Sequence, residues 1–211
     1  MAEYLPLFPL NSVVFPGETL RLYIFEPRYK QLINECNEQG STFGIPPVMD
    51  NQIVNIFTEV ELKQIDRTYE GGEMDIHVKG IRRAKILQYD EVAPGKLYPG
   101  GEISWLDSDE RGNPELQKIV FDLFVELNNA LGFRRVELSE LPKLHSFSIG
   151  HQVGLTSEQE CKLLGMDSES GRLSFLRDHL RKILPTIKKQ ERNKVKAKMN
   201  GHFKDAQHPD Y

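Results

Sequence analysis

Alternation of apolar and polar residues dominates the first half of the chain. The clearest case is residues 54–62, where every second position is apolar or threonine and most of the others are polar. A two-residue period is typical of a β-strand with one face in a core. Residues 20–24 and 74–78 repeat the pattern, and residues 81–88 and 101–106 indicate further strands. Several short strands separated by turns predict a closed or nearly closed barrel.

Turn residues lie between these strands. Residues 15–18, Phe-Pro-Gly-Glu, place proline second and glycine third, as a tight β-turn requires. Residues 70–73, Glu-Gly-Gly-Glu, predict a hairpin turn. Gly80 interrupts a strand pattern and predicts a bulge or bend. Residues 4–14 are apolar but contain two prolines, which favours an edge strand or a strand end.

One helix is expected within this β-rich half. Tyr29, Leu32, Ile33 and Cys36 recur at the spacing of a single helical stripe, which predicts a helix near 27–39. The preceding Glu26-Pro27 pair suits a helix start, with the carboxylate of Glu26 as the expected cap. Gly40 follows as a natural helix end.

The second half carries helical periodicity throughout. Asn113-Pro114 is expected to begin a helix that ends at Gly132. Three more segments follow: one or two short helices within 138–154 near Pro142, a helix opened by a capping box at 157–160 and ended by Gly165, and a long amphipathic helix over 173–187 that contains Pro185.

The patterns together divide the chain at the polar stretch 107–113. Residues 1–107 are expected to form a β pseudobarrel, and residues 113–193 an α-helical subdomain. Residues 194–211 are polar and basic and are predicted to be a flexible tail. The fold class is therefore α+β, a β pseudobarrel followed by a helical bundle.

Charge is distributed unevenly along the chain, whose net charge is −4. Residues 181–211 hold nine basic and three acidic side chains, whereas residues 1–180 hold 18 and 28. An acidic body argues against nucleic acid as the main partner, because phosphate binding relies on many Lys and Arg contacts. The basic end is interpreted as a solvated helix end, with contact to nucleic acid, an anionic membrane or an acidic partner as the alternatives.

Location and redox state follow from what the sequence lacks. No apolar run reaches the roughly 18 residues of a membrane span, and the N-terminus has no basic signal-like segment. Cys36 and Cys161 lie far apart, outside any metal-binding spacing, and are interpreted as buried thiols in a reducing compartment. A cytoplasmic protein with no membrane partner is expected.

Motifs for catalysis or metal binding are absent as well. The sequence contains no GxxxxGK[ST] phosphate loop and no HExxH, and His145 and His151 lie six residues apart rather than four. No catalytic residue, metal or cofactor is therefore expected. The chain carries neither an ATPase motif nor an identifiable serine–lysine protease site.

Several motifs resemble one known family. Residues 5–10, 14–17 and 24–29 look like the opening of the Lon protease N-terminal domain in its stand-alone bacterial form. Residues 78–86 are similar to its central strand pair, with alanine at position 84 where the family usually has an aromatic residue. Further resemblance lies in residues 98–103 and, loosely, 155–164, so that it covers roughly residues 4–185. The resemblance implies a PUA-like pseudobarrel followed by helices.

The resemblance also implies a role in recognising protein substrates. The expected function is a non-catalytic module that binds unfolded or extended apolar segments in protein quality control, together with a separate ATP-dependent protease as a possible collaborator. Burial of apolar surface in a groove between barrel and helices, with strand addition at an exposed edge, would supply the affinity. The candidate lining residues are Phe8, Phe15, Tyr23, Phe25 and Tyr98.

Two other function classes remain open. The first is an RNA-binding protein, by analogy to PUA-like folds, although residues 1–107 hold ten basic and sixteen acidic side chains. The second is an enzyme of unknown type. Arg28, Arg82 and Arg83 are candidate contacts to an anion or a partner, and the competing interpretation is structural. In it Arg28 forms an ion pair across the barrel, and one of Arg82 and Arg83 pairs with a surface acid along the barrel wall.

Overall fold

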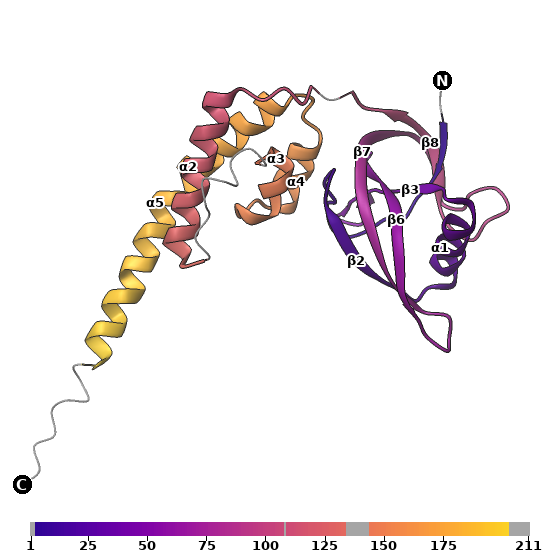
Figure 1. Cartoon of the computed structure of the whole chain (residues 1–211), viewed down its shortest axis with the longest axis horizontal. Coiled ribbons are helices and arrows are strands. Elements are labelled where there is room, and N and C mark those ends of the chain that lie inside the picture. The colour runs from indigo at the N-terminus through magenta and orange to yellow at the C-terminus, as the bar shows by residue number, and fades with distance from the viewer. Residues whose placement is uncertain (1–2, 108, 134–143, 203–211) are drawn as a thin grey trace, which may run out of the picture.

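The structure, a computed structural model, describes residues 3–107, 109–133 and 144–202 (Figure 1). The first half is mainly β structure: β1 (Glu3–Pro6), β2 (Thr19–Ile24), α1 (Pro27–Gln39), β3 (Thr42–Ile45), β4 (Val48–Met49), β5 (Gln52–Ile53), β6 (Ile56–Thr68), β7 (Met74–Asp90) and β8 (Gly100–Trp105). The second half is helical: α2 (Pro114–Leu131), α3 (Ser146–Ile149), the short 3-10 helix η2 (Gly150–Gln152), α4 (Ser157–Leu164) and α5 (Glu169–His202). The predicted α+β fold class is confirmed.

Hydrogen bonding closes most of the strands into a pseudobarrel. The main sheet has the order β1-β8-β7-β6-β3, and β2 pairs with β7 beside this path. The backbone N–H of Phe8 donates to the carbonyl of Gly44 at 2.8 Å, and Leu7 forms a parallel bridge with Gly44. The segment after β1 therefore joins β3 and completes the ring, while β2 stays outside it.

The long strand β7 changes partner at the predicted bulge. Its first part pairs with β2, and its last part pairs with β8. Opposite β6 the register shifts so that Val60 faces Gly80 and Glu59 faces Arg82. A Cβ atom on Gly80 would lie 2.4 Å from the carbonyl oxygen of Phe15, so this crossing point requires glycine.

Helix α1 forms where the sequence predicts it. Tyr29, Leu32, Ile33 and Cys36 are all buried, and they pack on residues of β3, β6 and β7. Gly40 ends the helix with a φ of 63°, in the left-handed region that suits glycine. Glu26 is the N-cap residue, but its side chain accepts no hydrogen bond from an amide of the first turn, so the predicted carboxylate cap is wrong.

The helices of the second half have the predicted end signals, with one shift. Asn113 accepts hydrogen bonds from two amides of the first turn of α2, and Gly132 ends that helix with a φ of 71°. The capping box of α4 is formed by Thr156 and Gln159, one residue before the predicted pair. Pro142 lies outside the described residues, and the chain downstream forms the short helices α3 and η2.

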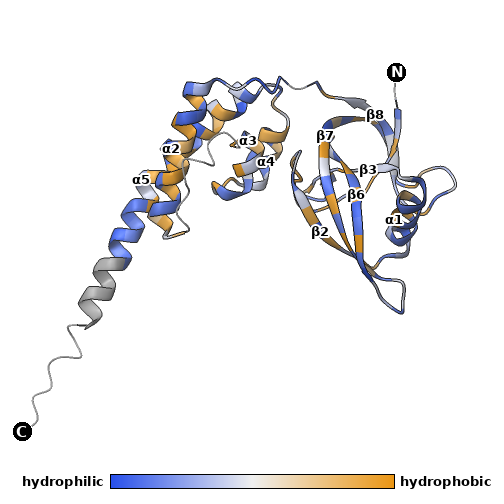
Figure 2. Ribbon diagram, viewed as in Figure 1, coloured by the Kyte–Doolittle hydropathy of each residue, from blue (hydrophilic) through white to orange (hydrophobic). Residues whose placement is uncertain are grey.

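Helix α5 is longer than predicted. It continues through Pro185 and reaches His202, so residues 194–202 are helical where the sequence predicts a flexible tail. Figure 2 shows the coloured part of this helix turning hydrophilic toward its C-terminal end. Lys188 forms an ion pair with Glu126, so α5 still contacts α2 at this position. Residues 203–211 lie outside the described residues.

Barrel and helices share a packed junction. Val13 and Phe15 come from the barrel half of the chain, yet both belong to the hydrophobic core of the helical subdomain. The ring of Phe15 is fully buried and stacks on Phe147 at a centroid distance of 5.3 Å. The turn at residues 15–18 thus joins the two parts.

Candidate functional site

The five aromatic residues predicted to line a groove separate into two groups. Phe8, Phe15 and Tyr98 are buried, with exposed fractions of 7%, 0% and 3%. Tyr23 and Phe25 are 54% and 59% exposed. The structure therefore corrects the prediction that all five line one open groove, since only Tyr23 and Phe25 present most of their rings to solvent.

Core packing explains the burial of Phe8 and Phe15. The ring of Phe8 lies 4.2 Å from that of Tyr29, so it fills the space between the barrel and α1. Phe15 instead fills the core of the helical subdomain. Both residues flank the turn-rich segment after β1, where no strand alternation indicates which side chains face inward.

Tyr98 anchors the loop before β8 to α1. Its hydroxyl donates to Glu35 at 2.5 Å, and Lys96 donates to the same carboxylate at 2.7 Å. Burial and the bond to Glu35 raise the pKa of Tyr98, while the bonds from Lys96 and Tyr98 lower the pKa of Glu35. Tyr98 also borders a separate hollow of about 380 Å³ beside α1.

Arg28 and Arg82 each have a carboxylate and an aromatic partner. Arg28 donates to Glu26 at 2.8 Å and lies over the ring of Tyr29, so its partner is local rather than across the barrel. Arg82 donates to the buried carboxylate of Glu59 at 2.6 Å. Its guanidinium carbon lies 3.4 Å from the centroid of the Trp105 ring.

Arg83 points the other way, into the junction. Its guanidinium donates to the carbonyls of Leu164 at 2.7 Å, Met166 at 2.9 Å and Asp107 at 3.0 Å. The side chain is almost fully buried. Arg82 and Arg83 therefore form no joint anion site, because they bind on different sides of β7.

Two exposed aromatic side chains, Tyr23 and Phe25, lie together at the far end of β2, next to the half-buried Tyr69. Tyr23 stacks on Phe25 at a centroid distance of 6.1 Å and meets the edge of Tyr69 at 6.0 Å. Tyr69 donates its hydroxyl to Asp75, which raises the pKa of this phenol. Arg67 lies over the same ring at 4.5 Å. Tyr23, Phe25 and Tyr69 are called the aromatic cluster below.

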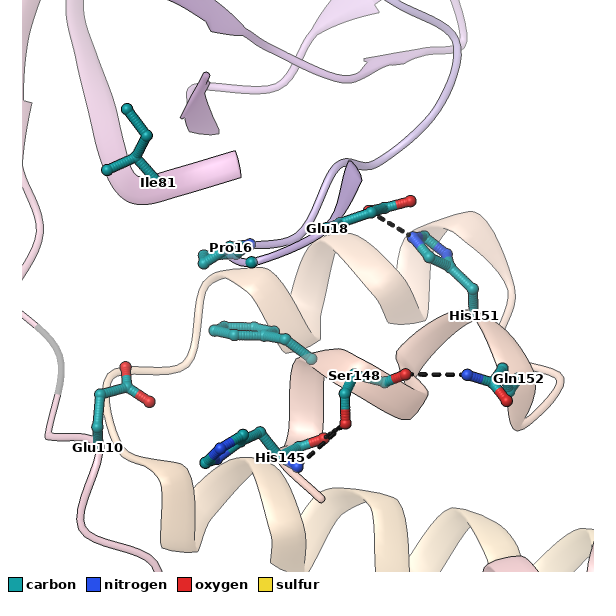
Figure 3. A pocket seen from close by; sticks show the side chains of 10 residues that line it. Pro16, Glu18, Ile81, Glu110, His145, Ser148, His151 and Gln152 are labelled. Atoms are coloured by element: carbon teal, nitrogen blue, oxygen red, sulfur yellow. Dashed lines mark hydrogen bonds and ion pairs between the residues drawn. The ribbon is translucent and has the colours of Figure 1, made fainter. Parts of the chain in front are cut away.

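A second feature, the interdomain pocket, includes Pro16, Gly17 and Glu18 just before β2, at the opposite end of that strand. Figure 3 shows the side chains that line it. Its volume is about 760 Å³, and its surface is mainly apolar. None of the five predicted aromatic residues lines it. The barrel and the linker contribute Pro16, Gly17, Glu18, Ile81 and Glu110, and the helices contribute His145, Phe147, Ser148, His151 and Gln152.

His151 bridges the two parts of the chain beside this pocket. Its Nδ1 lies 2.8 Å from Glu160 of α4, and its Nε2 lies 3.2 Å from Glu18 of the barrel. The imidazole ring packs on Phe15 at 4.5 Å. The bond to Glu18, with a smaller contribution from Glu160, raises the pKa of His151 to about 9 against the effect of burial. The imidazolium thus pairs with a carboxylate from each part.

The described residues offer few groups for metal or covalent chemistry. Among them, no three His, Cys, Asp or Glu side chains gather as a metal site would require. Burial raises the pKa of both Cys36 and Cys161, and the sulfur of Cys161 lies 3.2 Å from that of Met49. Within the same ranges, no helix has the length and apolarity to cross a bilayer.

The interdomain pocket lies where the sequence predicts a groove, between the barrel and the helices, although its lining differs from the predicted one. The His151 bridge carries no local signal, because it joins residues 133 positions apart. The spacing of His145 and His151 bears only on a metal site, for which it is unsuitable. Tyr23, in contrast, carries a signal, since it alternates with the inward-facing Leu22 and Ile24.

Comparisons with known proteins agree on one family. The model of the ATP-dependent protease La (LON) substrate-binding domain matches residues 4–182. The chain is similar to the crystal structure of a Lon N-terminal domain protein from Xanthomonas campestris, with 29% identity, a TM-score of 0.64, and coverage of 82% of this chain and 96% of that one. The N-terminal domain of Mycobacterium avium complex Lon protease shares the fold at 18% identity and a TM-score of 0.64, with coverage of 85% and 98%.

Proposed function

We propose a function that proceeds from one premise: the chain belongs to the ATP-dependent protease La (LON) substrate-binding domain family. The proposed function is non-catalytic binding of other proteins through segments that expose apolar residues, as unfolded chains do. The observation that carries it is the aromatic cluster, in which Tyr23 and Phe25 are more than half exposed and stack on each other. Large exposed aromatic groups of this kind mark interaction sites in soluble proteins.

Burial of this cluster supplies the driving force. Aromatic side chains bury about 150–250 Å² each, so covering the exposed halves of Tyr23 and Phe25 removes on the order of 200 Å² from water. At about 25 cal/mol per Å², the gross gain is on the order of 5 kcal/mol. Part of this gain is lost to the entropy of association, which leaves a weak and reversible site. Weak binding suits a module that samples many different clients.

RNA binding receives no such support. The barrel half is acidic, with sixteen acidic and ten basic residues over 1–107. Arg82 is engaged by Glu59 and Trp105, and Arg83 by backbone carbonyls. Neither of these two arginines is free to meet a phosphate, and binding to a phosphate backbone relies on many such contacts. We therefore advance protein binding alone.

The proposal is tested by titrating a fluorescent, permanently unfolded protein, reduced and carboxymethylated lactalbumin, with the full chain. The double variant Tyr23→Ser/Phe25→Ser should bind at least tenfold more weakly, which corresponds to about 1.4 kcal/mol. Phe133→Ser is the matched control, because Phe133 is 64% exposed but follows α2 in the helical subdomain. Equal affinity of the wild type and the double variant would contradict the proposal.

A further inference from the structure

Among the described residues, the outer edge of β2 has no backbone partner, because β2 hydrogen-bonds only to β7, on its other side. Thr19, Arg21 and Tyr23 also have exposed side chains, so the outer face of the strand is open to solvent as well. An open edge offers backbone N–H and C=O groups that another extended chain can satisfy.

The pattern of hydrogen bonds between β2 and β7 shows which backbone groups of β2 do not bond to β7. The N–H of Gly80 donates to the carbonyl of Glu18, and the same set of opposed pairs continues at Leu20, Leu22 and Ile24. Hydrogen-bonded pairs alternate with non-bonded pairs in an antiparallel ladder. The backbone groups of the intervening residues, including Arg21, therefore point away from β7 and toward solvent.

The two features described above lie at the two ends of this edge. The aromatic cluster lies at the Tyr23 end, and the interdomain pocket begins at Glu18, next to the first residue of β2. Six residues of strand span about 20 Å. One extended segment of similar length could therefore contact the cluster, pair with the β2 backbone and place an apolar side chain at the pocket.

Charged side chains near the edge favour one kind of incoming segment. The Arg21 side chain is 64% exposed, although it also lies 3.4 Å from Asp75. Arg67 lies over Tyr69 and has no carboxylate within ion-pair distance among the described residues. Both arginines flank the aromatic cluster and favour an acidic residue on the incoming segment. The outer edge of β6 near Lys63 lacks such a cluster and carries several charges, which discourage pairing.

We propose that β2 accepts an extended segment of a client protein as an added strand, with aromatic or β-branched residues and a carboxylate among its side chains. This inference rests on the proposed function and names the class of segment that the site recognises. It also distinguishes the site from a groove for amphipathic helices, because a helix has no backbone groups to pair with an edge.

The test on the protein uses a proline at an outward-facing position. Arg21→Pro removes an N–H that faces solvent and leaves the bonds to β7 intact, as edge strands tolerate. Arg21→Ala is the matched control, because it removes the same side chain and keeps the N–H. The probe is a fluorescent eight-residue peptide of alternating valine and threonine with an aspartate at each end. Arg21→Pro should bind this probe at least tenfold more weakly than Arg21→Ala.

A second test uses the wild-type protein and changes the probe, so it holds even where Arg21→Pro fails to fold. Two peptides are made, one N-methylated at the odd residues and the other at the even residues. Only one set of amides faces β2 in an added strand, so one peptide should lose binding while the other keeps it. Equal effects of the two methylation patterns would overturn the proposal.

The outcomes separate this inference from the proposed function. If the unfolded lactalbumin depends on Tyr23 and Phe25 but Arg21→Pro binds like Arg21→Ala, client binding stands and strand addition fails. A second outcome is that the wild type self-associates in sedimentation velocity and does not bind the peptide, whereas the Arg21→Pro variant is monomeric. The occupant of the edge is then a second copy of the chain, and the proposal fails as well.

Discussion

Replacement of Arg83 by methionine tests whether this buried side chain joins the barrel to the helices. Its guanidinium donates to three backbone carbonyls: that of Leu164 at the end of α4, that of Met166 just after this helix, and that of Asp107 in the linker. Hydrogen bonds from a charged donor contribute about 1.5–3 kcal/mol each, and their loss leaves buried carbonyls unsatisfied. The Nε atom of Arg83 is buried without a hydrogen-bond partner among the described residues, so removing this atom offsets part of the loss in stability. We expect Arg83→Met to lower the free energy of unfolding by about 3–5 kcal/mol.

Urea denaturation followed by circular dichroism measures this effect, and the neighbouring Arg82→Met is the comparison. Arg82 is half exposed and holds one ion pair and one aromatic contact, and Thr42 still donates to the buried carboxylate of Glu59 when Arg82 is replaced, so its loss should cost about 1–2 kcal/mol. A domain of this size typically has a total stability of about 5–15 kcal/mol, so the difference is measurable. Equal destabilisation by the two variants, or a loss below 1 kcal/mol for Arg83→Met, would refute the assignment of Arg83 as the junction.

Two further predictions concern the same junction. The pKa of His151 is raised from 6.5 to about 9 in the folded protein. Its pairing with Glu18 and Glu160 therefore stabilises the fold fully below pH 6.5, the pKa of histidine in the unfolded chain. This stabilisation is lost as the pH rises through 9. After discounting for partial exposure, we expect urea denaturation of the wild type to show a decline of about 1–2 kcal/mol over that range, which His151→Gln should lack. Gly80→Ala should lower stability by about 1–3 kcal/mol in thermal melts, since its Cβ would meet the Phe15 carbonyl; an unchanged melting temperature would show that the crossing point can relax.

Local chemistry explains which parts of the fold the sequence could predict. Gly40, Gly80 and Asn113 each meet a requirement of the backbone at their own position. The sequence alone therefore predicts the structural role of each. The capping box at α4 was misplaced by one residue because Thr156-Gln159 and the predicted pair beginning at Ser157 offer the same spacing of hydroxyl and acceptor. The end of α5 was misjudged because polar, basic composition is compatible with both a solvated helix and a tail.

The candidate site depended on contacts that no local pattern encodes. Strand alternation could have separated Tyr23 from Phe8 and Phe15, because Tyr23 lies on the face of β2 opposite to the partly buried Leu22 and the buried Ile24. The adjacent Arg82 and Arg83 likewise lie on opposite faces of β7, but which face meets the helices is decided by residues some eighty positions later. Tertiary packing, rather than residue type, assigns these roles.

The open edge of β2 is best understood against what the rest of the barrel does. The segment after β1 closes the ring by bonding to β3, so the fold removes one edge by closure. Proteins usually blunt a remaining edge with charge, proline or a covering element, because an exposed edge beside apolar side chains promotes aggregation. β2 has no proline, a single arginine and two exposed aromatic residues at its end. A feature that costs solubility and is not compensated nearby is expected at a functional site, and this consideration favours β2 over the closed faces of the barrel as the proposed site for client proteins.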